Sequence, residues 1–318
     1  MTRLPFFKIQ AKTHLEFGFK LGLEIKKKVE KSLQQKLEHF KLSVIERYIR
    51  EIKPYLSLCQ EYTPDFIEEL KGLSRGAKVP FEHIFLINCR EVFDKLDAQR
   101  CTTVVVKNKD GYLIGHNEDW EEEGETDLYV VKAKIGSKTI FGLNFSCELL
   151  GNSICFNSFG IIQAINDLAH TDRRVGLPKN FIARKILEAK DKDEILEILG
   201  KYPRASGFNH VIITKGQVYN IETTAFEVDL QRIDNFPFVH TNHYLSKLKK
   251  YEAWGSPRTF KRYKKAVKLA SKIKTTEDLY SFLGNREGYP ASVCNNETNA
   301  SVIVSSNDLS MKVFLPKK

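Results

Sequence analysis

The sequence predicts an α+β fold in which β-sheets lie between layers of helices. Three observations support this. The first hundred of the 318 residues carry mainly helical periodicity. At residue 101 the pattern changes to β-branched runs typical of strands, and helical and strand blocks alternate beyond it. A hydrophobic content of 42%, with 12 Tyr and 21 Phe, suffices for one large core or two modest ones and excludes a disordered chain.

The first basic segment is predicted to be an amphipathic helix. Its apolar residues recur every three or four positions: Ile25, Val29, Leu33, Leu37 and Phe40. The lysines between them are expected on the solvent face: Lys26, Lys27, Lys28, Lys31 and Lys36. A second basic segment, 258–272, has the same character. We therefore interpret the net charge of +10 as solvated helix faces and expect neither nucleic acid nor a membrane as partner.

Other helices are predicted from start and stop signals. The helical pattern continues to Ile49, and Thr63-Pro64-Asp65 begins a further helix with proline in its first turn. The glycines at 72 and 76, with Pro80, predict a loop before a mainly apolar helix over 81–96. Later helices are expected over 178–199, as a pair, and over 258–282.

The strands are predicted from β-branched and alternating runs. The range 101–106 forms the first, a tight turn at Asn108–Gly111 follows, and 112–116 returns as the second. Further strands are expected over 128–135, 139–145, 154–157, 160–166, 210–214, 218–222, 225–230, 238–240, 301–304 and 312–314.

The first hairpin brings a thiol and a carboxylate into the same region. Cys101 and Asp119 lie 18 positions apart on its two arms. Facing residues of antiparallel strands have Cβ atoms about 4.5–5.5 Å apart. We therefore expect the Asp119 carboxylate to reach the thiol or the backbone nitrogen of residue 101.

The remaining composition favours a protein without cofactors. None of the six cysteines forms a Cys-x-x-Cys pair, which argues against a zinc ribbon or a redox site. His240 and His243 flank Asn242 without a third ligand at useful spacing, so we expect no metal. No apolar run is long enough for a membrane span, and the first one is broken by Lys8, so we expect a cytoplasmic protein.

The segment from Arg100 to Trp120 resembles the nucleophile segment of the isopenicillin N acyltransferase family. That family belongs to the N-terminal-nucleophile hydrolases, with bile salt hydrolases and acid ceramidase-type amidases. Its pattern is Cys-Thr, a hairpin and Gly-x-Asn-x-Asp-aromatic, which stands here as Gly115-His-Asn-Glu-Asp-Trp120. Similar segments follow in the family's order from about residue 60 onward: 66–91, 156–168, 177–188, 206–211, 221–223 and 239–244.

The resemblance implies a four-layer αββα sandwich that is made as a precursor. Residues 1–100 would be a helical prosegment packed on the same fold, and residues 101–318 the catalytic part. The chain would cut itself between Arg100 and Cys101, and the two fragments would stay associated. Whether the protein forms a homo-oligomer is left open.

The resemblance also implies residue roles. Cys101 would be the nucleophile, and its freed α-amino group the base for its own thiol. Asp119 would hold that amine, and Asn242 would form the oxyanion hole. From residue type alone, a cap of the turn after the strand at 238–240 is the favoured role of Asn242, and only the family motif favours the oxyanion hole. The substrate would be a small-molecule amide or acyl compound, with hydrolysis and acyl transfer both open. The alternative function is a non-catalytic basic protein of this fold that binds nucleic acid or another anion.

Three positions depart from the family pattern. His116 stands where related amidases often carry Arg, and could supply a pH-dependent charge or be an ordinary strand residue. In Ser292-Val-Cys-Asn295, Asn295 replaces a basic residue, which points to a different substrate. Arg100 is larger than the Gly that precedes the cut in the acyltransferase. By position, we expect His116, Asn166 and Ser292 to bind substrate.

Overall fold

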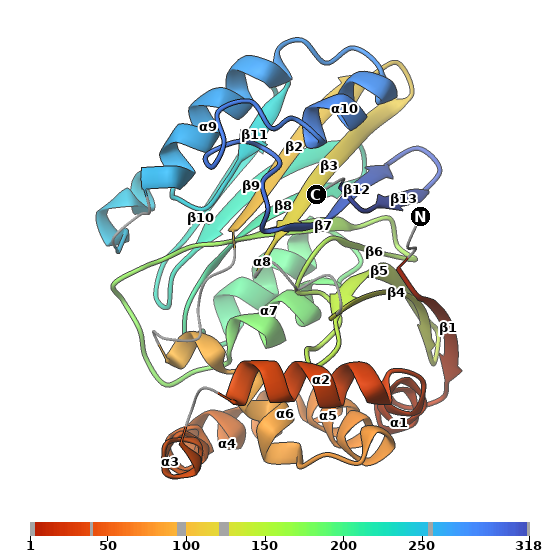
Figure 1. Cartoon of the computed structure of the whole chain (residues 1–318), viewed down its shortest axis with the longest axis vertical. Helices are drawn as coiled ribbons and strands as arrows, with labels where there is room; N and C mark the ends of the chain where they lie inside the picture. The colour runs from red at the N-terminus through yellow and green to blue at the C-terminus, as the bar shows by residue number, and fades with distance from the viewer. Residues whose placement is uncertain (1–3, 39–40, 94–99, 121–126, 254–256, 317–318) are drawn as a thin grey trace.

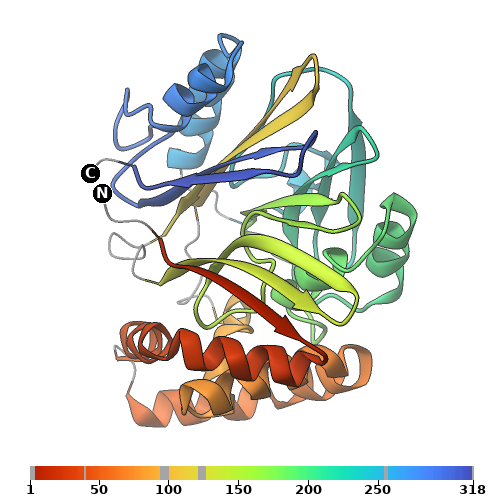
Figure 2. The ribbon, with the colours of Figure 1, turned by 90° about the vertical axis from the view of Figure 1, so that its right-hand side faces the viewer.

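The computed structural model describes residues 4–38, 41–93, 100–120, 127–253 and 257–316, which form two β-sheets stacked between two layers of helices (Figures 1 and 2). The large sheet runs in the order β1 (Phe6–Ala11), β4 (Leu128–Ile135), β5 (Lys138–Phe145), β6 (Cys155–Asn157), β7 (Ile162–Asp167), β8 (Phe208–Thr214), β9 (Gln217–Thr223) and β10 (Val228–Ile233). The small sheet runs β11 (Phe238–His240), β2 (Arg100–Asn108), β3 (Gly111–Asp119), β12 (Thr298–Ser305) and β13 (Met311–Phe314).

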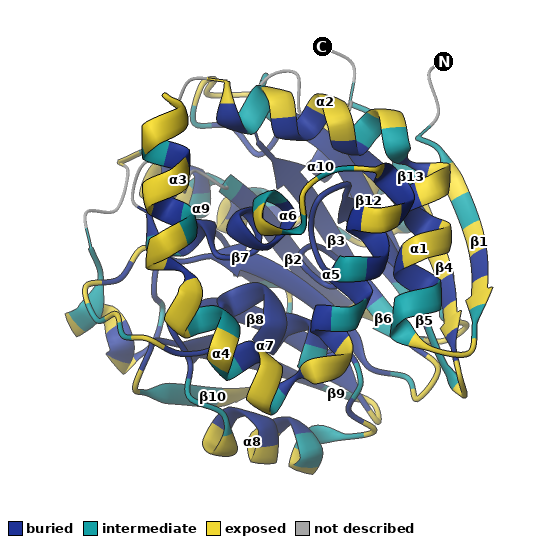
Figure 3. Cartoon of the chain, turned by 90° about the horizontal axis from the view of Figure 1, so that it is seen from below, coloured by how far each residue is buried: buried dark blue, intermediate teal, exposed yellow. Residues whose placement is uncertain are grey.

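The helices divide between the two outer layers. Those on the large sheet are α1 (His14–Glu24), α2 (Lys26–Leu37), α3 (Leu42–Glu51), α4 (Lys53–Tyr62), α5 (Pro64–Ala77), α6 (Phe81–Ile87), α7 (Lys179–Ile186) and α8 (Lys192–Lys201). Those on the small sheet are α9 (Pro257–Ala270) and α10 (Thr276–Leu283). Seen from below, the helices expose their outward faces, while the central strands behind them are buried and the edge strands β1 and β10 are partly exposed (Figure 3). None of the described helices is long and apolar enough to cross a membrane.

A separate apolar cluster fills each boundary between layers. Phe17, Phe66 and Phe181 join the helices to the large sheet. The neighbouring residues Val105 and Val104 belong to different clusters, the first between the two sheets and the second under α9 and α10. Alternate residues of a strand point to opposite faces, so β2 is buried on both sides. These layers confirm the predicted αββα sandwich.

The chain begins with a strand that the sequence analysis missed. Residues 6–11 fall in the region predicted to be helical, but form β1, which pairs in parallel with β4. The polar residues Lys8 and Gln10 alternate with the more buried Phe7, Ile9 and Ala11. That alternation is the period of a strand with one buried face.

The loop predicted at the glycines 72 and 76 is wrong, because both residues lie inside α5. They face α1 at very short range. A Cβ atom added at Gly72 would lie 2.2 Å from the carbonyl oxygen of Leu15, and one added at Gly18 on α1 would lie 1.9 Å from the carbonyl oxygen of Glu69. The glycines therefore allow the backbones of α1 and α5 to touch, and their helix-breaking tendency is overridden by packing.

The helix predicted over 81–96 ends early. It stops at Ile87, a short 3₁₀ turn covers Arg90–Val92, and residues 94–96 lie outside the described part of the chain. The Asn88 side chain donates to the carbonyl of Cys147 at 2.9 Å and accepts from the backbone nitrogen of Leu149 at 2.9 Å. These bonds connect the helix end to the segment after β5.

Lys36 is not on the solvent face where its position in the lysine series placed it. Its side chain is 11% exposed, and its ammonium group lies 2.7 Å from the Asp127 carboxylate. Burial alone raises the pKa of Asp127, but the Lys36 ammonium, together with the hydroxyls of Ser146 and Ser32, holds that pKa below its usual value. A buried carboxylate thus draws one lysine of the basic helix inward.

We expect Gly72→Ala to lower the free energy of unfolding by at least about 1–3 kcal/mol, the usual cost of overpacking, because the new methyl group meets rigid backbone. Urea unfolding monitored by circular dichroism measures this. Gly200→Ala is the matched control: Gly200 lies in α8 with no atom within 4 Å of an added Cβ. It should leave stability unchanged or raise it by up to about 1 kcal/mol. Equal effects of the two substitutions would contradict the close contact.

Candidate active site

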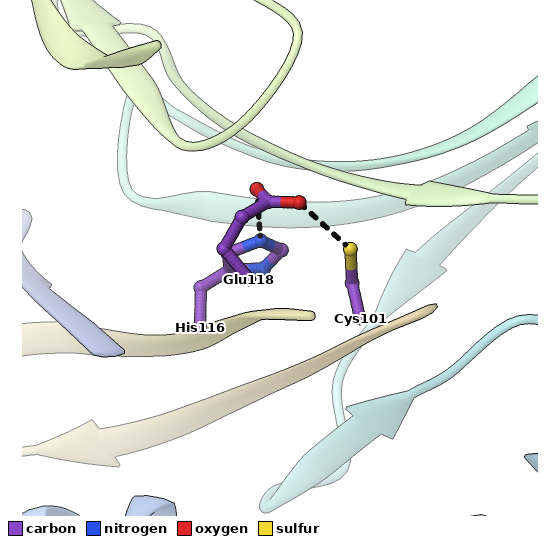
Figure 4. Close-up of side chains that lie close together, drawn as sticks. All are labelled: Cys101, His116 and Glu118. Carbon is purple, nitrogen blue, oxygen red and sulfur yellow. Dashed lines mark hydrogen bonds and ion pairs between the residues drawn. The ribbon is translucent and has the colours of Figure 1, made fainter. Parts of the chain in front are cut away.

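Cys101 lies near the start of β2, directly across from Glu118 on β3. Residues that face each other across an antiparallel pair point to the same side of the sheet. The thiol therefore meets Glu118, with 3.3 Å between Sγ and Oε1 (Figure 4). Asp119 is paired with Arg100 and points to the other side. The carboxylate that reaches the thiol is one residue away from the one expected.

Glu118 also forms contacts through its second oxygen. Oε2 accepts a short hydrogen bond from the Ser153 hydroxyl and lies 3.3 Å from Nε2 of His116. His116 Nδ1 lies 2.9 Å from the Thr103 hydroxyl, which in turn is 3.1 Å from Oδ1 of Asn166. All of these side chains are buried. His116 and Asn166 thus belong to one polar chain that begins at the Cys101 thiol.

Asp119 belongs to a second polar chain, which ends at the backbone nitrogen of Cys101. Its Oδ2 accepts from Arg262 at 3.1 Å and from Asn295 at 3.2 Å. The other terminal nitrogen of Arg262 donates to Oδ1 of Asn242 at 2.5 Å. The same oxygen accepts from the Cys101 amide at 2.8 Å. Asp119 therefore reaches residue 101 through Arg262 and Asn242, on the side opposite to the thiol.

Sequence reasoning missed Glu118 and Arg262. Counting the register from the turn at 109–110 pairs residue 101 with 118, so the signal for Glu118 was present. Arg262 belongs to the basic segment interpreted as solvated, but it shares the buried stripe of α9 with Ala266 and Ala270. A basic residue on an apolar helix stripe is the pattern that could have identified it.

Burial controls the protonation of the site. It raises the pKa of the Cys101 thiol well above its usual value, and the nearby Glu118 and Asp119 charges raise it further. Burial also raises the pKa of Asp119 to about 7, although the Arg262 guanidinium acts in the opposite direction. The sulfur is therefore a thiol in the structure described, and a proton acceptor is needed before it can act as a nucleophile.

Arg100 and Ser292, the remaining residues predicted for the site, form their contacts outside the two polar chains. The Arg100 guanidinium forms an ion pair with Glu297 at 2.6 Å, and Arg258 lies 3.3 Å from the same carboxylate. The Ser292 hydroxyl donates to the carbonyl of Cys294 at 2.5 Å, within its own turn. Ser292 is thus not brought into either polar chain.

Three side chains have the donor types and spacing of a metal site. The ligand atoms of Cys101, His116 and Glu118 lie within 4.8 Å of one another, and this is the one such cluster among the described residues. Thiolate, imidazole and carboxylate are ligands that zinc accepts. His240 instead contacts Glu222 at 2.8 Å. The absence of a metal from the working protein stays a prediction.

Comparisons with known proteins agree on a family. A family model described as acyl-coenzyme A:6-aminopenicillanic acid acyl-transferase matches residues 106–309. The 40 kDa form of the Emericella nidulans acyl-coenzyme A:6-aminopenicillanic-acid-acyltransferase is 26% identical over 261 residues, 79% of this chain and 71% of that protein. A Drosophila melanogaster β-alanyl-dopamine/carcinine hydrolase is 27% identical over 157 residues, 43% of this chain and only 41% of the hydrolase.

A solved structure supports the fold. The Caenorhabditis elegans ortholog of N-acylethanolamine-hydrolyzing acid amidase matches with a TM-score of 0.51 at 15% identity. The match covers 67% of this chain and 100% of that chain. The chain therefore has the fold of an N-terminal-nucleophile hydrolase.

The raised pKa of Asp119 predicts a stability that falls with pH. Between about pH 4, near the unfolded pKa, and about 7 in the folded state, the folded carboxyl holds a proton that the unfolded chain has lost. Its contribution to the free energy of unfolding should then decrease as pH rises, by at most about 1.4 kcal/mol per pH unit.

Urea unfolding of Asp119→Asn and its parent, both carrying Cys101→Ala so that no thiol titrates there, measures this contribution. The stability difference, parent minus Asn variant, should shrink from pH 4.5 to pH 7, the window set by those two pKa values. A difference that is constant with pH would contradict the raised pKa.

Proposed function

Because this chain belongs to the acyl-coenzyme A:6-aminopenicillanic acid acyl-transferase family, we propose that it cleaves a small-molecule amide through a thioester on Cys101, after cutting its own backbone before that residue. The observation that carries this proposal is that both the thiol and the backbone nitrogen of Cys101 contact buried polar side chains. Its thiol lies against Glu118, and its nitrogen bonds to Asn242, which Arg262 links to Asp119. The family match begins at residue 106, so the nucleophile is assigned from this geometry and from the sequence resemblance.

The first reaction acts on the chain itself. The Cys101 thiol attacks the carbonyl carbon of Arg100, and the acyl group passes from nitrogen to sulfur. Water then hydrolyses the thioester, which leaves Cys101 with a free α-amino group. An α-amine has a pKa of about 7.7–8.0, so it can serve as general base for its own thiol near neutral pH.

The polar chain from Asp119 supports this amine. The nitrogen of residue 101 already donates a hydrogen bond to the Asn242 oxygen at 2.8 Å, and Arg262, which also donates to Asp119, holds that oxygen in place. We assign Asp119 and Arg262 to positioning Asn242 and the amine. This differs from the simpler expectation that Asp119 would hold the amine itself.

Asn242 is also the proposed oxyanion donor. Its Nδ2 donates to the Asp167 carbonyl at 3.1 Å in the structure described, so substrate binding would have to redirect or share this donor. One side-chain amide aimed at a tetrahedral oxygen typically contributes a factor of about 10²–10³ to the rate.

The names of the relatives suggest the substrate class. The fly protein is named for hydrolysing β-alanyl-dopamine and carcinine, and the fungal protein for transferring an acyl group to 6-aminopenicillanic acid. Both reactions have an acyl group and a small amine as their two halves. We propose the same class for this chain, with the choice between water and an amine at the thioester deciding hydrolysis or transfer.

The three residues expected by position to bind substrate receive a different assignment. His116, Asn166 and Ser292 are all at 0% exposure and are bonded to other protein groups. We propose that the first two position the groups around the thiol and that Ser292 shapes its turn, and that none of the three lines the substrate pocket.

Intact-mass analysis tests self-cleavage. The purified chain should separate under denaturing conditions into fragments 1–100 and 101–318, and should run as one particle in native gel filtration. Cys101→Ala should stay whole and lack activity toward a panel of acyl-amine amides. Cys59→Ala, which removes a buried thiol in α4, should cleave normally. An intact wild-type chain that hydrolyses these amides would refute the cleavage requirement.

Asn242→Ala should lower kcat of the cleaved enzyme by about 10²–10³ if its amide stabilises the oxyanion. Turnover is to be counted per cleaved chain, since cleavage itself is expected to slow as well. If Asn242 only capped a turn, the substitution would reduce stability while kcat per folded, cleaved chain stayed within a few-fold of wild type.

A further inference from the structure

The self-cleavage step lacks the base that the later reaction uses. In the uncut chain the nitrogen of Cys101 belongs to the peptide bond with Arg100 and donates its hydrogen to Asn242 at 2.8 Å. An amide nitrogen has no lone pair available to accept the thiol proton. The freed amine therefore cannot serve the reaction that creates it, and another group must take this proton.

Glu118 is in the right place. Its Oε1 lies 3.3 Å from Sγ, a hydrogen-bond distance for sulfur, and both groups are buried away from water. Asp119 points to the opposite side of the sheet, where Arg262 and Asn295 occupy its Oδ2. Its carboxylate is thus directed toward the nitrogen side of residue 101.

The surroundings of Glu118 fix the direction of its reactive oxygen. The Ser153 hydroxyl and His116 contact Oε2, which leaves Oε1 facing the sulfur (Figure 4). His116 is held in turn by Thr103 at 2.9 Å. A general base must lie within hydrogen-bond reach of the proton that it removes, and these contacts hold Oε1 there.

We propose that Glu118 is the general base of the self-cleavage step and has no such task in amide turnover. The inference rests on the proposed function, since it concerns the same nucleophile. The family match and the relatives' names assign no role to this residue, and it was absent from the residues expected from sequence.

The proton transfers balance. Glu118 takes the thiol proton as the Sγ–C bond to Arg100 forms. When the C–N bond breaks, protonated Glu118 is the source of the proton that the departing nitrogen needs. The products are a thioester, a free amine and the original carboxylate. Water then splits the thioester into the Arg100 carboxylic acid and the Cys101 thiol, with no oxidant or reductant.

The freed amine then replaces Glu118. It is attached to the same residue as the sulfur and has a pKa of about 7.7–8.0, near neutral pH. Loss of Glu118 should therefore slow cleavage by a much larger factor than it slows turnover. A merely structural role would disturb the thiol's position in both reactions.

The test compares cleavage and turnover in full-length variants. Glu118→Gln should slow cleavage by about 10² or more, the usual contribution of a positioned base. Glu118→Asp, which keeps the carboxylate, should cleave at an intermediate rate. Cleavage is followed by intact mass, and amide turnover is measured per cleaved chain after long incubation, with cleaved thiols counted by a thiol-directed probe.

Glu69→Gln is the matched control, because the buried Glu69 also contacts a histidine, the half-buried His14 at 2.7 Å, on the helical side of the large sheet. It should cleave within about threefold of wild type when checked as folded by circular dichroism.

Three results would overturn the assignment: Glu118→Gln cleaving at the wild-type rate, Glu118→Asp as slow as Glu118→Gln, or equal losses of cleavage and turnover. If wild type itself stayed whole, the proposed function would fail instead, and the two failures are thus distinguishable. Slow cleavage of Glu118→Gln, faster cleavage of Glu118→Asp and a much smaller loss of turnover in the cleaved fraction than of cleavage would support it.

Discussion

The pairing of β2 with β3 determines the site. Cys101 faces Glu118 and Arg100 faces Asp119 because of this register. A shift by one residue would move every side chain of a strand to the opposite face. The pairing therefore places the thiol, Glu118 and His116 on one face of the small sheet. It places Asp119 on the opposite face, in contact with Arg262. Residue 101 presents its sulfur to the first group and its nitrogen to the second.

Burial gives both polar chains their chemical character. Charged groups removed from water are costly unless each finds a partner, and Asp119 finds Arg262 and Asn295. The same lack of water raises the pKa of the Cys101 thiol. The layers that exclude water thus keep the sulfur unreactive until a neighbouring group accepts its proton, and they limit which groups can do so.

The sequence predicted much of this arrangement, and the failures have physical causes. Local patterns predicted the fold class and the first hairpin. The family resemblance placed three residues in one site: Cys101, Asp119 and Asn242. The roles of these residues stay predictions. Arg262 was missed because contact with Asp119 depends on how α9 packs, 143 positions away in sequence. The glycines of α5 were interpreted as a loop because their partner is a distant backbone, that of α1. The contact of Glu118 with Cys101 could have been predicted from sequence by counting the strand register from the turn at 109–110.

The pairing of β1 with β4 bears on what a break at residue 100 would mean, because these two strands lie on opposite sides of that break in the sequence. Residues 6–11 complete a sheet whose other strands come from beyond residue 127. The helices before residue 93 share one apolar cluster with that sheet. A cut chain of this kind would be a heterodimer that assembled while it was still a single polypeptide. Its subunits would always be present in equal amounts and would never have had to find each other by diffusion.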